Sequence, residues 1–531
     1  MIKRTAYING KVFTVDENKK WAEAVVTYGD KIIFVGNNID ARKFINEDTK
    51  VIDLNNRLML PGFIDSHAHI IMGGEFLLSV DLSQAKSANE FILLLKNHIV
   101  QKRGKWIKGG NWNHQNWDIK DLPSKEWIDE FSIDTPVFVS RADYHMALAN
   151  SCALKLAGIT KDTPDPVGGL IERSKLTGEP TGILKDKAME LVYNVIPDLS
   201  EEENEASITA AMNLAKSYGV TSIHDICYKN HFRALQNADN KGYLTCRVYA
   251  RLPIDLHQHL IEAEIQKNFG SDKLKIGSVK AFADGALGAS TAYFFEPYED
   301  DNKNFGLAMD ILIDGRLKEW MLQCDKHKLQ LSVHAIGDRA ISEILDIVEE
   351  MNKQNPKWDR RFRIEHAQHM RQSDFKRCAE LNVIVSVQPY HLFDDGSWIV
   401  DKIGQERMLT TYAFNSFVKN NVKMCFGSDW SVATLNPLKG IYAAVTRHTC
   451  DNNNPDGLIP DEKITVEEAI KCYTINAAYS AFSEDKLGSI CVGKFADMVV
   501  INRNIFEIDP NEIKGTEVDL TVFNGEIIFS K

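Results

Sequence analysis

The 531-residue sequence predicts an α/β fold: a (β/α)8 barrel, a small β-sandwich formed by both chain termini, and an insertion after the first barrel strand. Three observations lead to this prediction. Eight apolar, β-rich runs alternate with helical patterns through the middle of the chain. Both chain ends are instead rich in hairpin signals. A stretch of irregular composition interrupts the alternation after the first of the eight runs.

The two chain ends, residues 1–57 and 487–531, have the pattern of short strands joined by turns. Three turn signals each separate two β-rich runs, as in a hairpin: Asn9-Gly10, Gly29-Asp30 and Asn524-Gly525. Because two ends of the same character flank a different middle, we expect one β-sandwich to which both contribute.

The predicted barrel spans residues 58–486. Its eight strand candidates are "GFIDSHAH", "GVTSIHD", "CRVYARL", "KIGSVKAFAD", "LQLSVHA", "RFRIEHAQ", "VIVSVQP" and "VKMCFGSD". Alternation of such runs with helical stretches is typical of parallel βα units. The segment "TVEEAIKCYTINAAYSAF" predicts a helix near the end, and Thr465 and Glu468 have the spacing of a capping box in front of it.

Residues from about 75 to 205 do not follow the alternation. They contain Trp, Asn, Pro and Gly in irregular order, as in "GGNWNHQNW" and "DTPDPVGGLIERSKLTGEPTG". They also contain a strand-like run, "TPVFVSRADYH", which would make a ninth barrel strand. We therefore place this run in an insertion between the first and second barrel strands.

Composition excludes several classes of function. The chain has 62 basic and 74 acidic residues, a net charge of −12, which disfavours binding to nucleic acid or to an anionic membrane surface. No apolar run approaches the roughly 20 residues that cross a bilayer, and the N-terminus lacks the apolar stretch of a signal peptide. Nine cysteines without a CxxC pair indicate reduced thiols. We expect a cytoplasmic protein with a small-molecule substrate.

Two histidines in "PGFIDSHAHI" suggest a metal-binding site. His67 and His69 lie two apart at the end of an apolar strand, so their side chains project from the same face. In a barrel, the carboxyl ends of the strands surround the active site. Neutral imidazole is a common metal ligand. An HxH pair alone also fits two histidines with local hydrogen bonds.

The other strand ends strengthen the metal interpretation. Each carries a polar residue behind an apolar run: Lys280 and Asp284, His334, His366, and Asp429. Burying so many polar groups at one rim is costly unless they pair or coordinate an ion. A shared metal site explains all of them together.

These motifs resemble the metal-dependent amidohydrolase superfamily. The resemblance rests on "PGFIDSHAH", the strand lysine, the later strand histidines, "GSDW" and the closing segment from "TVEEAIKCYTINAAYSAF" to "GKFADMVVIN". Within amidohydrolase family 3, the chain is similar to the branch of N-substituted formamide deformylase, through "RADYHMALANSCAL", "GVTSIHD" and "VKAFADGALGASTA". Tyr144, where glycine is expected, and "MALAN" after His145, where an aromatic residue is more usual, depart from that pattern, and we expect both to reshape the substrate pocket.

The resemblance implies roles for the strand-end residues. His67 and His69 bind one metal, His334 and His366 bind a second or help bind a shared one, and Lys280 bridges two metals as a carbamate. Asp429 contacts the metal and acts as general base, while His334 helps to polarise the carbonyl. A single metal would use His67, His69, His366 and Asp429. The resemblance implies one or two divalent ions per chain, with Zn²⁺ as the default and iron, manganese or nickel as alternatives.

The implied reaction is hydrolysis of a non-peptide C–N bond, in an amide or N-substituted formamide, by metal-activated water. Two alternatives stay open: deamination of a cyclic amidine or amino-heterocycle, and a non-catalytic regulatory role on the same fold. The resemblance also implies a homodimer.

Four further residues are candidates for substrate contact. Asp143 and His145 of the insertion either contact substrate or hold their own segment in a local polar network. Trp112 either walls the pocket or packs structurally. His391, shortly after the seventh strand run, is placed to reach substrate.

Overall fold

The computed structural model describes residues 3–102, 104–118, 121–141, 145–166, 168–228 and 230–531. Two compact units divide the chain: Met1–Ile71 with Ala211–Lys531, and Met72–Ala210. The first unit contains the barrel and the sheets of both termini.

The barrel is a ladder of eight parallel strands, and all eight predicted strands are confirmed. In chain order they are β8 (Phe63–Ala68), β15 (Val220–Asp225), β16 (Arg247–Pro253), β18 (Leu274–Phe282), β19 (Gln330–Ala335), β20 (Arg363–His366), β21 (Ile384–Val387) and β22 (Lys423–Phe426). Each pairs with the next along the chain. Ala68 pairs in parallel with Trp430 across the seam between β8 and the segment after β22. The ladder therefore closes on itself, and the strands' carboxyl ends meet at one rim.

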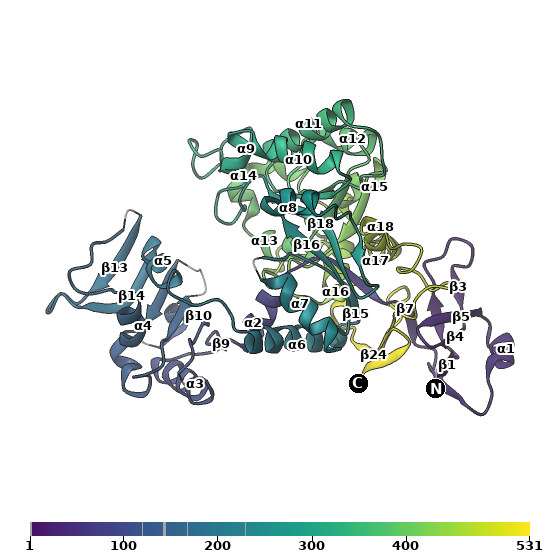
Figure 1. Cartoon of the computed structure of the whole chain (residues 1–531), viewed down its shortest axis with the longest axis horizontal. Helices are drawn as coiled ribbons and strands as arrows, with labels where there is room; N and C mark the ends of the chain where they lie inside the picture. The colour runs from purple at the N-terminus through teal and green to yellow at the C-terminus, as the bar shows by residue number, and fades with distance from the viewer. Residues whose placement is uncertain (1–2, 103, 119–120, 142–144, 167, 229) are drawn as a thin grey trace. The chain divides into compact units, whose positions relative to one another are not determined.

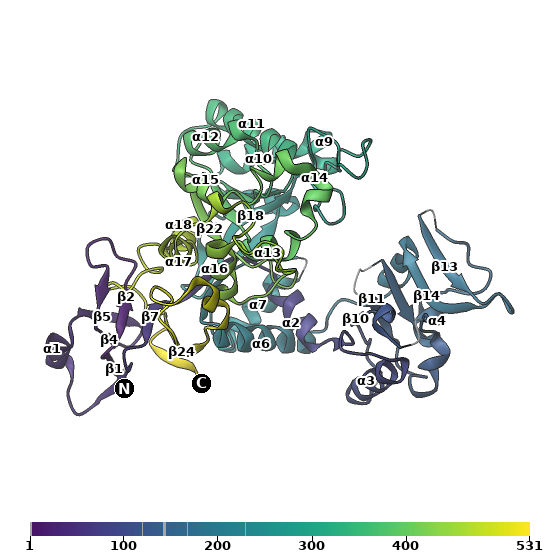
Figure 2. The same cartoon turned by 180° about the vertical axis from the view of Figure 1, so that it is seen from behind.

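Helices cover the outside of the barrel (Figure 1), among them α10 (Arg316–Lys326), α11 (Asp338–Gln354) and α12 (Gln372–Glu380). The buried residues of α11 recur every three or four positions, which makes one apolar face. The predicted closing helix is divided into α17 (Val466–Cys472) and α18 (Ile475–Ser480), both in contact with β22 (Figure 2). The predicted capping box of Thr465 and Glu468 is present at the start of α17.

Two sheets from the chain termini form the β-sandwich. The first has the order β5-β4-β1-β6 and the second β25-β24-β23-β7-β2-β3. Their bounds are β1 (Arg4–Ile8), β2 (Lys11–Phe13), β3 (Trp21–Ala22), β4 (Ala24–Tyr28), β5 (Lys31–Gly36), β6 (Thr49–Asp53), β7 (Leu58–Pro61), β23 (Met498–Ile501), β24 (Val518–Phe523) and β25 (Glu526–Ser530). Strand β7 pairs with β23, so the two termini are joined in one sheet. Tyr7 of the first sheet and Met59 and Val522 of the second share one hydrophobic core.

One of the three hairpin predictions is wrong. Gly29-Asp30 joins the antiparallel pair β4 and β5, and Asn524-Gly525 joins β24 and β25. At Asn9-Gly10, however, the chain passes from one sheet to the other, because β1 pairs with β4 and β6 while β2 pairs with β3 and β7. Asn9 has the positive φ of 55° that such a turn needs. Turn chemistry thus supplies the bend but does not decide which strands pair.

The unit Met72–Ala210 has a six-stranded sheet and a core of its own, and the predicted insertion of about 75–205 falls within it. The sheet order is β13-β14-β12-β11-β10-β9. The strands are β9 (Val80–Asp81), β10 (Gly109–Trp112), β11 (Phe138–Arg141), β12 (Met146–Ala149), β13 (Gly169–Arg173) and β14 (Pro180–Asp186), and α3 (Ala88–Gln101) packs Phe91 and Leu95 into the core. The run "TPVFVSRADYH" thus contributes β11 to this sheet and adds no strand to the barrel. Among the described residues, no helix combines the length and apolar character needed to span a bilayer.

Candidate metal centre

Three residues that the sequence places far apart converge at the barrel rim. His67 on β8, His366 on β20 and Asp429 after β22 are all buried, and each offers a ligand atom within 4.8 Å of the other two. His67 Nε2 lies 3.4 Å from Asp429 Oδ1, and His69 Nε2 lies 3.1 Å from the same oxygen. The structure therefore brings together four of the predicted ligands.

Backbone hydrogen bonds across the seam fix these side chains. Asp429 N donates to His67 O at 2.7 Å, and His69 N donates to Trp430 O at 2.7 Å. The Asp65 carboxylate accepts from the backbone N–H groups of both His67 and Ser428. Because these bonds join β8 to the segment after β22, the positions of the ligand side chains depend on closure of the barrel.

Two of the three converging residues have left-handed backbone conformations. The φ of His366 is 72° and that of Asp429 is 56°. Non-glycine residues adopt such angles rarely, and strained residues of this kind cluster at functional sites. Each of these conformations occurs at the end of a barrel strand or just after it.

Lys280 and His334 lie beside this group. Lys280 on β18 is buried, its Nζ lies 4.2 Å from the Phe282 ring centroid, and burial lowers its pKa to about 7. The His334 ring lies 4.5 Å from the His366 ring, and burial lowers the pKa of His334 to about 3. His334 Nε2 lies 2.9 Å from Gly285 O, to which it donates. Both predicted ligands therefore lie beside the converging group, but His334 is not one of the residues whose ligand atoms all lie within 4.8 Å of one another.

The residues fit a divalent cation. Among the histidines and the lysine of this region, four buried nitrogens have no hydrogen-bond partner among the described residues: His69 Nδ1, His366 Nδ1, His391 Nε2 and Lys280 Nζ. Burial holds the pKa of His366 well below its ordinary value, so its imidazole is neutral and can act as a ligand. Burial alone would raise the pKa of Asp429, but the charge of His67 and the hydrogen bonds of His67 and His69 outweigh it and hold that pKa well below its usual range. A carboxylate among imidazoles is the donor set that zinc and related metals prefer.

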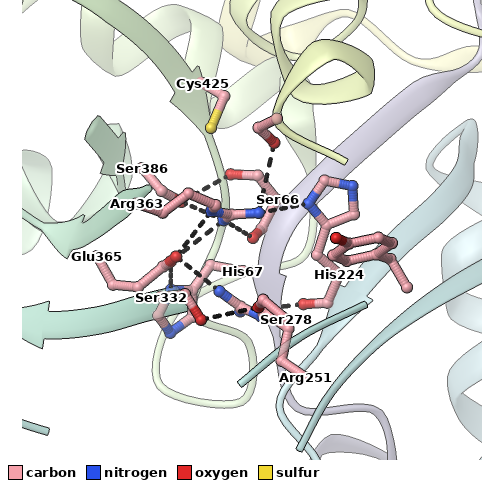
Figure 3. Close-up of polar contacts among 12 residues, drawn as sticks. Ser66, His67, His224, Arg251, Ser278, Ser332, Arg363, Glu365, Ser386 and Cys425 are labelled. Atoms are coloured by element: carbon pink, nitrogen blue, oxygen red, sulfur yellow. Dashed lines mark hydrogen bonds and ion pairs between the residues drawn. The ribbon is translucent and has the colours of Figure 1, made fainter. Parts of the chain in front are cut away.

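Sequence reasoning missed the group beneath these ligands (Figure 3). Glu365, fully buried on β20, lies 2.5 Å from His67 Nδ1 through Oε2. Its Oε1 lies 2.8 Å from Arg251 Nη1 and 2.9 Å from Arg363 Nε. Burial alone would raise the pKa of Glu365, but the two guanidinium groups hold it well below its usual range. The ionised carboxylate must therefore accept from His67 Nδ1–H, which leaves His67 Nε2 free to coordinate.

A weak signal for this group exists in "RFRIEHAQ". Arg363 and Glu365 are two apart on a strand, so both point into the barrel interior. Two charged residues facing a barrel core must find partners there. The partner Arg251, on β16, could not be named without the fold.

The predicted substrate-contact residues have different surroundings. His391, in α13 (Pro389–Asp395), places Nε2 3.8 Å from Asp429 Oδ2, and its ring stacks on that of His366 at 6.2 Å and 14°. His145 is exposed in the unit Met72–Ala210, with Nδ1 2.8 Å from Asp186 Oδ1. Trp112 is fully buried in that unit's core and donates from Nε1 to Val139 O at 2.9 Å, which favours the structural alternative for this residue. Asp143, like Tyr144, lies outside the described residues.

Comparison with known proteins identifies related chains. Residues 50–529 match the family model described as "Amidohydrolase family". The chain is 38% identical over 513 residues to Protein LONG AFTER FAR-RED 3 of Arabidopsis thaliana, covering 94% of this chain and 87% of the relative. It is 32% identical to the putative amidohydrolase YtcJ of Bacillus subtilis, covering 98% of both chains. It is 27% identical to N-substituted formamide deformylase of Arthrobacter pascens, covering 99% of this chain and 98% of the relative.

A solved structure agrees with the fold over the full chain. The crystal structure of an uncharacterized metal-dependent hydrolase from Pyrococcus horikoshii matches with a TM-score of 0.81 and 27% identity. The match covers 96% of this chain and 99% of that one. The barrel and the sheets of the termini therefore share the architecture of a metal-dependent hydrolase.

Proposed function

Because the chain belongs to the amidohydrolase family, we propose that it is a metal-dependent hydrolase that cleaves a C–N bond other than a peptide bond. The bond would be that of an amide or an N-substituted formamide. The observation that carries the proposal is the convergence of buried His67, His366 and Asp429 at the barrel rim. Similarity to N-substituted formamide deformylase supports the choice of bond.

The chain offers ligands for one or two ions. His67, His69, His366 and Asp429 would hold a single Zn²⁺. When bound, the metal supplies a Lewis acid and makes water nucleophilic at neutral pH. A second ion would engage His334 and Lys280.

Lys280 meets the chemical requirement for a bridging carbamate. Burial lowers its pKa to about 7, so a large fraction of the amine is neutral at physiological pH. The amine nitrogen would form a bond to the carbon of CO₂ and lose a proton, which gives an anionic carbamate. This change replaces a buried amine that has no hydrogen-bond partner among the described residues with a carboxylate-like ligand.

Two other side chains would move protons. Asp429, ionised because its pKa is held low, would accept a proton from the attacking water and pass it to the leaving nitrogen. The neutral His334 donates Nε2–H to Gly285 O, and it could donate the same hydrogen to a substrate carbonyl instead.

The test is elemental analysis of the purified full-length protein beside the Lys280→Ala variant. Lys275→Ala, on the same strand β18, is the matched control. About two metals per chain, falling in Lys280→Ala alone, would support the bridged site. One metal, unchanged in Lys280→Ala, would remove Lys280 from the ligand set, and no metal after growth with zinc and bicarbonate would overturn the proposal.

Turnover separates the reaction classes. The metal-loaded protein and a chelated sample would be assayed on formamides, other amides and amino-heterocycles. Hydrolysis of formamides or amides, lost on chelation, is the expected result. Turnover of amino-heterocycles alone would favour deamination, and a metal-loaded protein that turns over none of them would favour a non-catalytic role.

A further inference from the structure

A cavity of about 660 Å³ lies within the barrel unit beside the metal centre. Its walls come from the ends of β15, β16 and β18 and from the helices α9 (Asp310–Ile313) and α10 (Arg316–Lys326). Its size falls within the range of about 300–1,000 Å³ that is typical of small-molecule sites. The cavity is therefore large enough for a substrate group of several carbons.

The cavity adjoins the metal centre, because one of its lining residues is a predicted ligand and two others contact predicted ligands. Lys280 is itself one of those ligands. The Phe282 ring lies 5.3 Å from the His334 ring, and the Tyr228 ring stacks on His69 at 5.9 Å and 12°. A group bound in the cavity can thus belong to the molecule whose scissile bond lies at the rim.

The lining is mainly apolar. Phe282, Met309, Ile311 and Trp320 are only partly covered by protein and present hydrocarbon surface to the cavity. Buried Ile254 adds to the same surface. Water is expelled from such a surface when a hydrocarbon group binds, at roughly 0.8 kcal/mol per buried methylene, which corresponds to about fourfold in affinity.

The charged residues of the lining do not supply a buried counter-charge for a substrate. Arg316 is already paired with Asp314 at 2.7 Å and lies over the Trp320 ring at 5.7 Å. Asp255 and Asp310 are exposed at the edge of the cavity, where water solvates them. Lys280 is the buried charged group of the lining, and the proposed function assigns it to the metal.

We propose that this cavity receives an uncharged hydrocarbon substituent of the substrate, so that the preferred substrates are amides or formamides with an apolar group of several carbons on the nitrogen. The inference rests on the proposed function, because the substituent belongs to the molecule that is hydrolysed. Trp320 and Met309 determine the preference, and neither contributes to the metal centre.

The experiment compares N-alkylformamides, from N-methyl to N-hexyl, with N-hexyl analogues that end in a carboxylate or an ammonium group. For the metal-loaded full chain we expect kcat/KM to rise about fourfold per methylene until the cavity is filled. The charged analogues should be poorer substrates than N-hexylformamide. A preference for either charged analogue, or no dependence on alkyl length, would overturn the inference.

Substitutions of cavity residues test whether the preference for long alkyl substituents depends on the cavity. Trp320→Ala should lower kcat/KM for N-hexylformamide by about tenfold, mainly through KM, and leave the N-methyl compound and the metal content unchanged. Met309→Lys should weaken the N-hexyl compound and improve the carboxylate analogue. Trp21→Ala, the same truncation at a partly exposed tryptophan on β3, is the matched control and should change none of these values. Equal effects of Trp320→Ala on N-methyl and N-hexyl compounds would contradict the assignment.

Calorimetric binding of N-hexylformamide separates this inference from the proposed function. Binding that Trp320→Ala weakens, without turnover, would uphold the cavity and overturn the hydrolysis of formamides. Turnover without a role for Trp320 would uphold hydrolysis and overturn the cavity. Neither binding nor turnover would overturn both.

Discussion

Two polar layers lie next to each other inside the barrel, and they differ in whether the protein completes them. The metal layer consists of His67, His69, His366 and Asp429 at the rim. The ionic layer beneath it consists of Arg251, Arg363, Glu365 and His224 (Figure 3). Both are buried.

The ionic layer pairs its charges internally. Glu365 lies between the two guanidinium groups, and Arg363 also donates to Ser66 O at 2.7 Å and to Ser386 Oγ at 2.9 Å. In the metal layer, by contrast, His69 Nδ1 and His366 Nδ1 have no partner among the described residues. The charges of the ionic layer are thus paired within the chain, although Arg251 Nε has no hydrogen-bond partner among the described residues, whereas the free ring nitrogens of the metal layer can bind a ligand from outside the chain.

The largest expected effect comes from breaking the ionic layer. Glu365→Gln keeps the shape of the side chain but removes the negative charge that two buried arginines share. Removing one partner of a buried pair typically costs about 3–5 kcal/mol, so the free energy of unfolding should fall by about that much. Denaturant unfolding of the metal-free protein measures it.

The control for this variant is Glu343→Gln, which breaks a surface pair with Arg339 on α11. Exposed pairs contribute about 0–1 kcal/mol, so the control should unfold close to the wild-type midpoint. Equal midpoints for Glu365→Gln and Glu343→Gln would mean that the ionic layer does not support the fold.

The second prediction separates the two layers, because a substitution in the metal layer should weaken metal binding and leave the stability of the fold unchanged. His366→Asn removes an imidazole of the metal layer, and asparagine tolerates the φ of 72° at this position. Loss of a residue that only supports a ligand typically weakens metal binding by about 10–100-fold, so loss of the ligand itself should weaken it by at least about 100-fold. The metal-free variant should unfold near the wild-type midpoint. Metal titration and denaturant unfolding measure the two quantities.

His369→Asn serves as the control for His366→Asn. His369 is also buried, three residues further along the chain, but its Nδ1 bonds Thr411 Oγ1 at 2.9 Å, away from the metal layer. It should retain wild-type metal content. If His366→Asn bound metal as tightly as the control, His366 would not belong to the ligand set.

The two layers also differ in how far the sequence predicts them. His67, His366 and Asp429 each follow an apolar run, and the rule that barrel strand ends meet at one rim is enough to bring them together. Glu365 and Arg251 lie within strands, and their pairing depends on the barrel's radial geometry, which no local pattern encodes. The eight strands were predictable because each is a β-rich run between helices.

Other features needed long-range information. The chain crosses between sheets at Asn9-Gly10 because β2 pairs with β7, and β7 pairs with β23, in the sheet that joins the termini. Trp112 was a candidate for the substrate pocket by residue type alone, and its burial against Phe91 and Trp117 follows from the separate core of its unit. In both cases, the pairing of β2 and the burial of Trp112, the outcome depends on tertiary contacts with residues that are distant in sequence.

The smallest effect concerns pH and tests whether the ionic layer is closed to protons. His224 Nδ1 lies 2.9 Å from Arg363 Nη1, which can only donate, so the His224 imidazole is neutral. Burial, and then the charges of Arg363 and Arg251, hold the pKa of His224 well below its ordinary value.

Below the ordinary histidine pKa of about 6.5, the unfolded chain binds a proton at His224 that the folded chain does not, so stability falls as the pH falls. One such proton contributes a slope of up to about 1.4 kcal/mol per pH unit between pH 6.5 and the lower folded pKa. Relative to wild type, metal-free His224→Asn should lose this slope between about pH 6 and 5. Denaturant unfolding at each pH measures it. The control is His327→Asn, at an exposed histidine, which should keep the wild-type slope. An unchanged slope in His224→Asn would mean that His224 takes up a proton in the folded state, and the ionic layer would then be open to titration like a surface site.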